Sequence, residues 1–292
     1  MWERFQNETL RDNSGTLSDP AMGKFFFFVL CSLLAGSALA QAASASTAWP
    51  HGARVAVSLG YDDTLASQLD VALPALNRHG LKASFYLQLS SPVLQSRLAE
   101  WRQAARQGHE LGNHSLFHQC AGSLPGHEWV SAARDLDSTM AAQMADQVLL
   151  GNAMLHAIDG EIERTYTVPC GDHVARDGDY LARIASAFVG MKVGGGSGVT
   201  ARSALRRDAV AVLAPVGLNG RELIALVRTA AAQGDMVNLT FHGVGGDYLS
   251  TAAAAHEELL AYLASHRDEY WTDTFRNIMR FVRAQEDADG HH

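Results

Sequence analysis

The sequence has few cysteines, few prolines, no basic run and no apolar stretch long enough to cross a bilayer. Its 292 residues include 3 Cys and 7 Pro. Three thiols are too few for a disulfide-rich mini-domain or an all-cysteine structural zinc site. Lys and Arg number 23 against 31 acidic residues, and the formal charge is −8. Because an acidic chain repels a phosphate backbone, we expect no nucleic-acid partner.

The longest apolar run, residues 25–34 (FFFFVLCSLL), is shorter than the roughly 20 residues that a transmembrane helix needs. Lys24 precedes the run, and the A-x-A sequence 38–40 follows it. This pattern is typical of a signal peptide, here 22–40, whereas a core helix would not end in small residues. We therefore expect an exported protein, periplasmic or extracellular, without a membrane span after cleavage.

Residues 1–21 are polar, and signal peptides rarely begin that way. We interpret them as an upstream extension from a misassigned start, with Met22 as the true one. Cleavage after Ala40 would remove Cys31 and leave Cys120 and Cys170. In an oxidising compartment these two form either a disulfide or a pair of buried thiols.

The remaining chain has ordinary globular composition, 47% hydrophobic and 18% charged. We expect a short linker at 41–50, one domain at 51–287 and a tail at 288–292. Predicted strands are 54–58, 83–87, 110–113, 166–168, 188–190, 210–213 and 237–241. Helical patterns cover 66–76, 94–107, 129–149, 221–233, 257–263 and 270–285. This alternation predicts an α/β fold, a single distorted (β/α)-barrel of about seven parallel strands.

Polar clusters follow several of these strands. Asp62 and Asp63 are adjacent carboxylates, which need a cation or a shared proton. The alternative is that they cap the next helix. His114 and His118 are four residues apart and can share one divalent metal, although both can also be capping or surface histidines. A Pro-x-Gly turn at 169–171 and His242 end two further strands, and a barrel gathers such strand ends together.

The order of the clusters resembles the polysaccharide deacetylases of the NodB-homology type, carbohydrate esterase family 4. Residues 60–64 (GYDDT) match its Thr-Phe-Asp-Asp-Gly motif, and 114–118 (HSLFH) match His-Ser/Thr-x-x-x-His in full. Residues 167–171 (TVPCG) match half of Arg-x-Pro-Tyr-Gly, and 239–242 (LTFH) match Leu-x-x-His. The resemblance spans about residues 54–242.

The resemblance implies one divalent metal, with zinc preferred, held by Asp63, His114 and His118. Three protein ligands leave a position for water and substrate, as in catalytic zinc sites. Asp62 would be the general base and His242 the general acid.

The family's third motif implies an oxyanion and substrate site built from Pro169, Cys170 and Gly171, in which the Cys170 N–H donates. Cys170 replaces the family's aromatic residue, and Cys120 follows His118 by two positions. If the motifs converge, the two cysteines are neighbours, and we expect a disulfide between them.

Some family residues are missing. Thr167 stands where the family has an Arg that orients the base, and Arg164 lies three residues too early for this role. No fourth motif is recognisable, and Asp172 or Asp235 are candidates to support His242. Tyr248, Trp129 and Trp271 are candidates for stacking on sugar rings, with burial under the last helices as the alternative.

We therefore expect an exported metal-dependent hydrolase that removes acetyl groups from a carbohydrate polymer. N-deacetylation of aminosugars is favoured because an amine leaving group needs the acid His242. An O-acetyl esterase on xylan-type polymers would use the same site. Two different classes of protein stay open: a metal-bound carbohydrate-binding protein with weak or no catalysis, and an amidohydrolase of small amides.

Overall fold

The computed structural model describes residues 49–233 and 235–289, which belong to one compact unit. The expected upstream extension, the signal peptide and most of the linker lie outside these residues, as do the last residues of the tail. Trp49 is already buried against Trp271 and Phe281. The packed chain therefore starts just before the expected boundary, and its last helix runs to Asp289.

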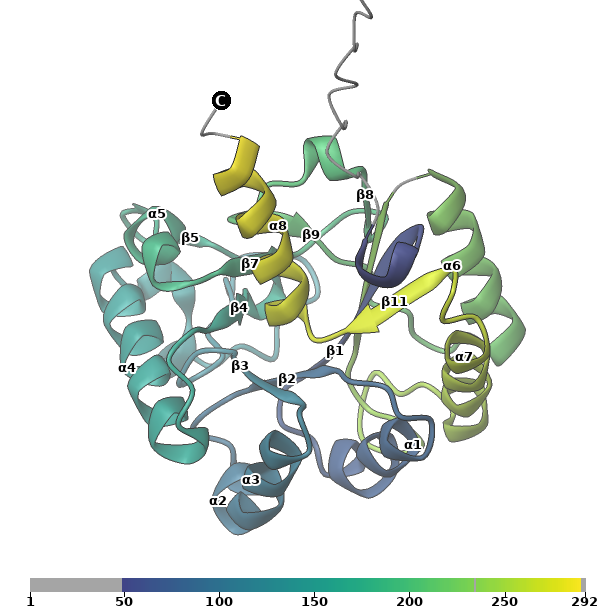
Figure 1. The fold of residues 1–292 in the computed structure, drawn as a ribbon. Coiled ribbons are helices and arrows are strands. Elements are labelled where there is room, and N and C mark those ends of the chain that lie inside the picture. The colour runs from purple at the N-terminus through teal and green to yellow at the C-terminus, as the bar shows by residue number, and fades with distance from the viewer. Residues whose placement is uncertain (1–48, 234, 290–292) are drawn as a thin grey trace, which may run out of the picture. The chain divides into compact units, whose positions relative to one another are not determined.

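The centre of the fold is a mostly parallel sheet, nearly closed into a barrel (Figure 1). Its parallel strands are β1 (Val55–Asp62), β2 (Ser84–Leu87), β3 (Glu110–Asn113), β4 (Thr165–Thr167), β7 (Gly190–Val193), β9 (Val210–Ala211) and β10 (Met236–Phe241). Just after β9, Leu213 bridges to β10: its N–H donates to Asn238 O, and the Thr240 N–H donates to Leu213 O. This closure confirms the expected barrel of about seven parallel strands.

Smaller strands complete the sheet. β11 (Tyr270–Asp273) runs parallel to the first half of β1, and β8 (Val199–Thr200) pairs with β10 in antiparallel fashion. β5 (Val174–Ala175) and β6 (Gly178–Asp179) form a separate hairpin.

Helices surround the barrel (Figure 1). They are α1 (Leu73–Arg78), α2 (Pro92–Ser96), α3 (Leu98–Arg106), α4 (Ala141–Asp159), α5 (Leu181–Ile184), α6 (Gly220–Gln233), α7 (Ala253–Ser265) and α8 (Phe275–Asp289). α8 covers the end at which the strands begin, because the Phe275 N–H donates to Ser84 Oγ and the Arg276 N–H to Glu110 Oε2. The carboxyl ends of the strands are left for the site.

Alternation along the strands decides which side chains enter the barrel. In β1, Val57, Leu59 and Tyr61 join the hydrophobic cluster under the outer helices. Because successive side chains point to opposite faces, Gly60 and Asp62 face the interior. The interior is therefore lined by small and polar groups near the site, although β1 is buried along its whole length.

Two sequence-based predictions of helix are wrong. Residues 129–140 form a loop with short 3-10 turns, since the Asp135 carboxylate accepts from the Asp137 N–H and caps a turn instead of continuing a helix. Residues 270–273 form β11, because the β-prone Tyr-Trp-Thr segment can pair with the first half of β1 along the edge where β2 pairs only with residues 60–62. Residues 94–107 also divide at Arg97 into α2 and α3.

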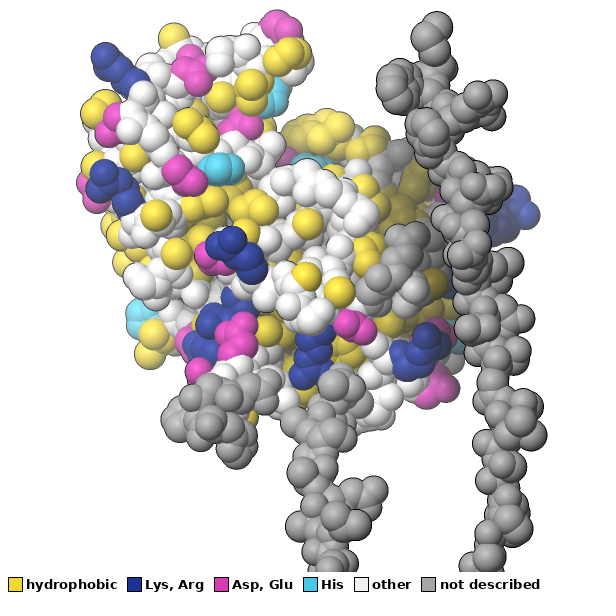
Figure 2. All heavy atoms as spheres, turned by 90° about the horizontal axis from the view of Figure 1, so that it is seen from above, with side chains coloured by type: hydrophobic (Ala, Val, Ile, Leu, Met, Phe, Trp, Pro, Cys, Tyr) yellow, Lys and Arg dark blue, Asp and Glu magenta, His cyan; other side chains and the backbone are white. Residues whose placement is uncertain are grey.

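On the face drawn in Figure 2, charged side chains of both signs are interspersed among uncharged ones. The coloured part of that view has no continuous basic area. Within residues 49–233 and 235–289, no helix combines the length and the apolar character needed to cross a membrane.

Candidate active site

The four sequence clusters meet in one pocket of about 970 Å³ at the carboxyl ends of the strands. Its lining includes most of the site residues expected from the sequence: Asp62, Asp63, His114, His118, Cys170, Gly171, His242 and Tyr248. Pro169, the first residue of the third-motif turn, is buried and does not line the pocket.

Asp63, His114 and His118 form a group with the geometry of a metal site. Oδ1 of Asp63 lies 3.1 Å from Nε2 of His114 and 3.0 Å from Nε2 of His118. The three ligand atoms are all within 4.8 Å of one another. Burial raises the pKa of Asp63, but the hydrogen bonds from the two imidazoles outweigh it and hold the pKa well below its usual range.

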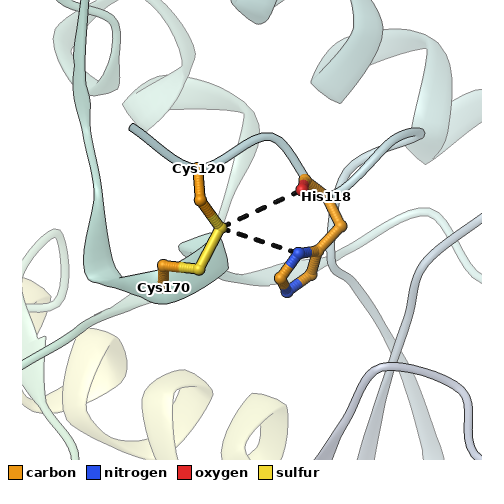
Figure 3. A group of neighbouring side chains, drawn as sticks. All are labelled: His118, Cys120 and Cys170. Carbon is orange, nitrogen blue, oxygen red and sulfur yellow. Dashed lines mark hydrogen bonds between the residues drawn. A yellow bond between two sulfur atoms is a disulfide. The ribbon is translucent and has the colours of Figure 1, made fainter. Parts of the chain in front are cut away.

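The other ring nitrogen of each imidazole, Nδ1, faces a neighbour that can only accept a hydrogen bond. Nδ1 of His114 lies 2.8 Å from the Thr167 carbonyl oxygen, and Nδ1 of His118 lies 3.7 Å from Cys120 Sγ (Figure 3). Nδ1 therefore donates in both rings, which leaves Nε2 of each ring as the atom that would bind a metal. One carboxylate and two such imidazoles fit a divalent metal of the zinc type.

Other groups of potential ligands around this pocket contain Cys120 or Cys170. These two residues form a disulfide, so neither offers a thiolate. Asp63, His114 and His118 therefore form the candidate metal site.

The backbone around the pocket is held in an unusual conformation. Within the described ranges, the non-glycine residues with a positive φ on the site loops are Asp63, Thr64, Ser115, His118, Cys170, Asp247 and Leu249. Such residues cluster at functional sites and cost about 1–3 kcal/mol each when truly strained. Local hydrogen bonds maintain them: Ser115 Oγ accepts from the His118 N–H, and Thr64 Oγ1 accepts from the Gln88 N–H.

Asp62 lies beside the metal group and is almost fully buried. Its burial raises the pKa of the carboxyl, while the charges of His114, His242 and Lys192 act in the opposite direction. Asp62 Oδ1 has no hydrogen-bond partner among the described residues. This oxygen is thus free to respond to a nearby cation or water.

His242 directly follows β10, and its Nε2 lies 3.7 Å from Asp63 Oδ2, whereas the other two histidines lie beside Oδ1. Gln68 Nε2 donates to the carbonyl oxygens of both Asp62 and His242, so one side chain ties the two strand ends together. Nδ1 of His242 is buried and has no partner in the described part of the chain.

Neither of the two acidic residues proposed to support His242, Asp172 and Asp235, is bound to it. The Asp172 carboxylate accepts from the Ala121 N–H, 2.8 Å away. Asp235 accepts from the Arg202 N–H and precedes β10, at the opposite end of the strand from His242. The expectation for Asp172 was wrong because its carboxylate binds the loop of Cys120 instead, and that for Asp235 because the length of β10 separates it from His242.

The third motif forms a tight turn, Pro169–Gly171, in which Cys170 has φ 57°. The Cys120–Cys170 disulfide joins this turn to the loop that carries His118, with the two Cα atoms 5.9 Å apart (Figure 3). A Cβ on Gly194 would lie 2.6 Å from Gly171 Cα, so two glycines allow the backbones to cross behind the turn.

The aromatic candidates separate into two groups. The Tyr248 hydroxyl donates to Asp63 Oδ2 at 3.0 Å, and Trp129 is 61% exposed with its ring centroid 6.3 Å from that of His118. Both line the pocket. Trp271 instead packs against Trp49 and Phe281 away from the pocket, and the burial alternative holds for this residue.

The structure adds one charged residue that the motifs do not contain. Lys192, in β7, is fully buried in the interior, and its charge acts on Asp62. Arg164 points elsewhere and forms a buried pair with Asp159. A lone lysine in the otherwise apolar strand GMKV was the available signal, since lysine is almost never fully buried without a partner.

Comparison with known proteins agrees with this architecture. Residues 51–187 match the polysaccharide deacetylase family. A putative polysaccharide deacetylase from Mycobacterium smegmatis superposes with a TM-score of 0.58 at 15% identity, over 82% of this chain and 93% of that one. Peptidoglycan deacetylase PdaC from Bacillus subtilis superposes with a TM-score of 0.51 at 16% identity, over 83% and 97%.

A curated relative, a gellan lyase from a Bacillus species, is 22% identical over 262 residues. The match covers 82% of this chain but only 10% of that much longer protein. The barrel, the matched residues and the superpositions define a carbohydrate-deacetylase class of fold. Residues 51–187 belong to the polysaccharide deacetylase family, and the barrel has the fold of the NodB-homology deacetylases.

Proposed function

We propose that this protein is an exported, metal-dependent hydrolase that removes acetyl groups from a carbohydrate polymer, with N-acetylated aminosugars as the favoured substrates. The observation that carries the proposal is the convergence of Asp63, His114 and His118 with two further titratable residues, Asp62 and His242, in one pocket. The metal-binding and proton-transfer groups of a hydrolase are therefore all within reach of one substrate.

Asp63 and the Nε2 atoms of His114 and His118 would hold the metal ion. When bound, a divalent metal supplies Lewis-acid polarisation of the acetyl carbonyl and lowers the pKa of water from about 15.7 to roughly 7. The proposed preference for zinc follows from the nitrogen and carboxylate donors.

Asp62 accepts the proton of the attacking water. Its raised pKa suits a general base better than an ordinary exposed carboxylate, because proton transfer is most efficient when the pKa approaches the working pH. The negative charge that develops on the carbonyl oxygen is stabilised by the Cys170 N–H in the strained third-motif turn. The disulfide holds this donor at a fixed distance from the loop of His118.

His242 donates a proton to the leaving nitrogen or oxygen. It reaches the pocket from the opposite side of Asp63 to the two metal-binding histidines, so base and acid come from β1 and β10. An amine cannot leave without this proton, and the presence of His242 therefore supports an N-acetyl substrate. The solved relative PdaC is named a peptidoglycan deacetylase, which supports the same substrate class.

The mouth of the pocket suits a sugar polymer. Three large side chains of the lining are at least half exposed: Trp129, Tyr248 and Leu249. The Arg134 guanidinium lies 3.7 Å over the Phe117 ring and also lines the mouth. Exposed aromatic faces flanked by polar groups are suited to stacking on sugar rings, whereas a small amide would leave them unused.

Export is part of the proposal. The signal peptide lies outside the described residues, but the Cys120–Cys170 disulfide supports an oxidising compartment. A metal-bound carbohydrate-binding protein with weak catalysis is the second candidate, favoured by one observation: His242 Nδ1 lacks, among the described residues, an acidic partner that would orient the ring.

The test is acetate release from chitooligosaccharides, peptidoglycan and acetylated xylan, with zinc and with chelator. We expect metal-dependent release, largest on N-acetylated substrates. His242→Ala should lose amide hydrolysis by about 10²–10⁴-fold but retain most cleavage of an activated aryl acetate, whose leaving group needs no acid. Equal losses on both would refute the assigned role of His242, and no release from any polymer would favour the binding protein.

A further inference from the structure

The interior of the barrel contains a charged group that the proposed mechanism does not yet use. Lys192 Nζ is fully buried and has no hydrogen-bond partner among the described residues. An unpaired buried ammonium is costly, so surrounding charges must stabilise it. Below it lie the rings of Tyr86 and Phe275, 4.8 and 5.0 Å from Nζ, in cation–π contact.

The ammonium lies against the strand that carries the proposed base. A Cβ on Gly60 would come 2.6 Å from Lys192 Nζ, so only the missing side chain of Gly60 makes room for it. Gly60 and Asp62 face the same side of β1, because residues two apart on a strand do so. The charge of Lys192 therefore acts on Asp62 from directly below the pocket.

The second carboxylate near Lys192 is already satisfied. Glu110 accepts hydrogen bonds from Ser84 Oγ, Thr165 Oγ1 and the Arg276 N–H. Asp62 Oδ1, in contrast, is buried without a partner among the described residues. The hydroxyls of Thr167 and Thr240 are also buried and, in the same part of the chain, unpartnered. Thr167 is the register neighbour of Lys192, and Thr240 is the register neighbour of Gly60.

We propose that Lys192 is the positioning residue for the general base: its ammonium, seated against Gly60, attracts Asp62 through Oδ1 and leaves the other carboxylate oxygen for the attacking water. An ordered water among Lys192, Asp62, Thr167 and Thr240 would satisfy the four unpartnered atoms. The family places an Arg at the position of Thr167, and here the cation comes from the adjacent strand. This inference rests on the proposed function of Asp62.

The electrostatics are consistent with this role. Burial lowers the pKa of Lys192 to about 8, while the charges of Asp62 and Glu110 act in the opposite direction. The residue thus stays mostly protonated at neutral pH. One ammonium and one divalent metal would balance the three buried carboxylates, Asp62, Asp63 and Glu110.

The first test is Lys192→Met, which keeps the unbranched side chain up to Cε and removes the charged Nζ. We expect kcat to fall about 10–100-fold, with KM and the zinc stoichiometry unchanged. Lys82→Met is the matched control, since Lys82 binds the Gln107 carbonyl far from the pocket, and should retain full activity. Adding Thr167→Arg to Lys192→Met returns a cation from the neighbouring strand and should recover part of the lost kcat.

A second measurement separates this inference from the proposed function. In a double-mutant cycle on unfolding free energy, Lys192→Met and Asp62→Asn should be non-additive, because the lysine loses its partner in the Asp62→Asn background. This holds even if no substrate is turned over. Additive losses together with an unchanged kcat in Lys192→Met would overturn the proposal.

If Lys192→Met does not fold, Gly60→Ala tests the same contact. Its Cβ must displace the ammonium while leaving the lysine charge in the protein. We expect the same selective loss of kcat. Full activity of a folded Gly60→Ala would overturn the proposal.

Discussion

The Cys120–Cys170 disulfide allows a quantitative prediction, because it joins two loops of the site across a separation of 50 residues. The double substitution Cys120→Ala/Cys170→Ala removes the disulfide. The unfolded chain then gains conformational entropy, because the loop is no longer closed, and the folded state becomes less stable relative to it. For a loop of this length the chain-entropy relation gives about 4 kcal/mol at 25 °C. We expect the free energy of unfolding to fall by about 2–4 kcal/mol, since the native structure can relax.

The folded site should survive this change in part. The Asp172 carboxylate still accepts from the Ala121 N–H, and the Thr167 carbonyl oxygen still accepts from Nδ1 of His114. These contacts also join the two loops. His118, however, loses the acceptor of its Nδ1–H, so zinc affinity should fall about 10–100-fold, as for other outer partners of metal-binding histidines.

The assay is denaturant unfolding of the metal-free protein, oxidised and reduced, with non-reducing mass spectrometry to establish the state of the thiols. The double variant should unfold like the reduced protein and earlier than the oxidised one. Coincident transitions for verified oxidised and reduced forms would refute the entropy argument. Unchanged zinc affinity in the double variant would refute the role of Cys120 in fixing His118.

Three further predictions concern single residues. Burial lowers the pKa of His256 to about 4 from 6.5. Between these pH values the unfolded chain therefore binds a proton at His256 that the native protein does not. As the pH falls from 6.5 to 4, this residue alone should lower the free energy of unfolding by about 3 kcal/mol. His256→Gln keeps an acceptor for the Tyr61 hydroxyl and should reduce the slope of stability against pH; identical slopes would contradict the assignment. Gly194→Ala forces a Cβ against Gly171 and should lower kcat about 10²-fold in acetate release, while Gly246→Ala, whose Cβ meets nothing nearer than 3.8 Å, serves as control. Asp63→Asn should weaken zinc at least about 10²-fold by calorimetry, and unaltered zinc binding would place the metal elsewhere.

The sequence predicts the barrel because its strands and helices alternate clearly. Strand ends from β1 to β10 carry the polar clusters, and parallel strands bring such ends to one side. The secondary-structure predictions that were wrong fall in segments where the local sequence pattern and the tertiary strand pairing favour different structures. Residues 270–273 have a helical pattern in sequence, but they form a strand because β2 leaves one edge of the first half of β1 open.

Contacts across the barrel could not be predicted in the same way. The position of Lys192 depends on the register of β7 with β4 and on the missing side chain of Gly60, which are distant in sequence. Similarly, Asp235 is close to His242 in sequence but at the other end of the same strand. Spacing along the chain identifies ligand pairs such as His114 and His118. The register between neighbouring strands, in contrast, decides which charged side chains lie together inside the barrel.

The most direct test of the account is acetate release by the zinc-loaded protein from an N-acetylated aminosugar oligomer, compared with Asp62→Asn. Asparagine keeps the shape of the side chain but cannot accept the proton from water. We predict metal-dependent turnover that falls by about 10²–10⁴-fold in the variant, with one zinc still bound per chain. Undiminished turnover in Asp62→Asn would contradict the central claim that Asp62 is the general base of a metal-dependent deacetylase.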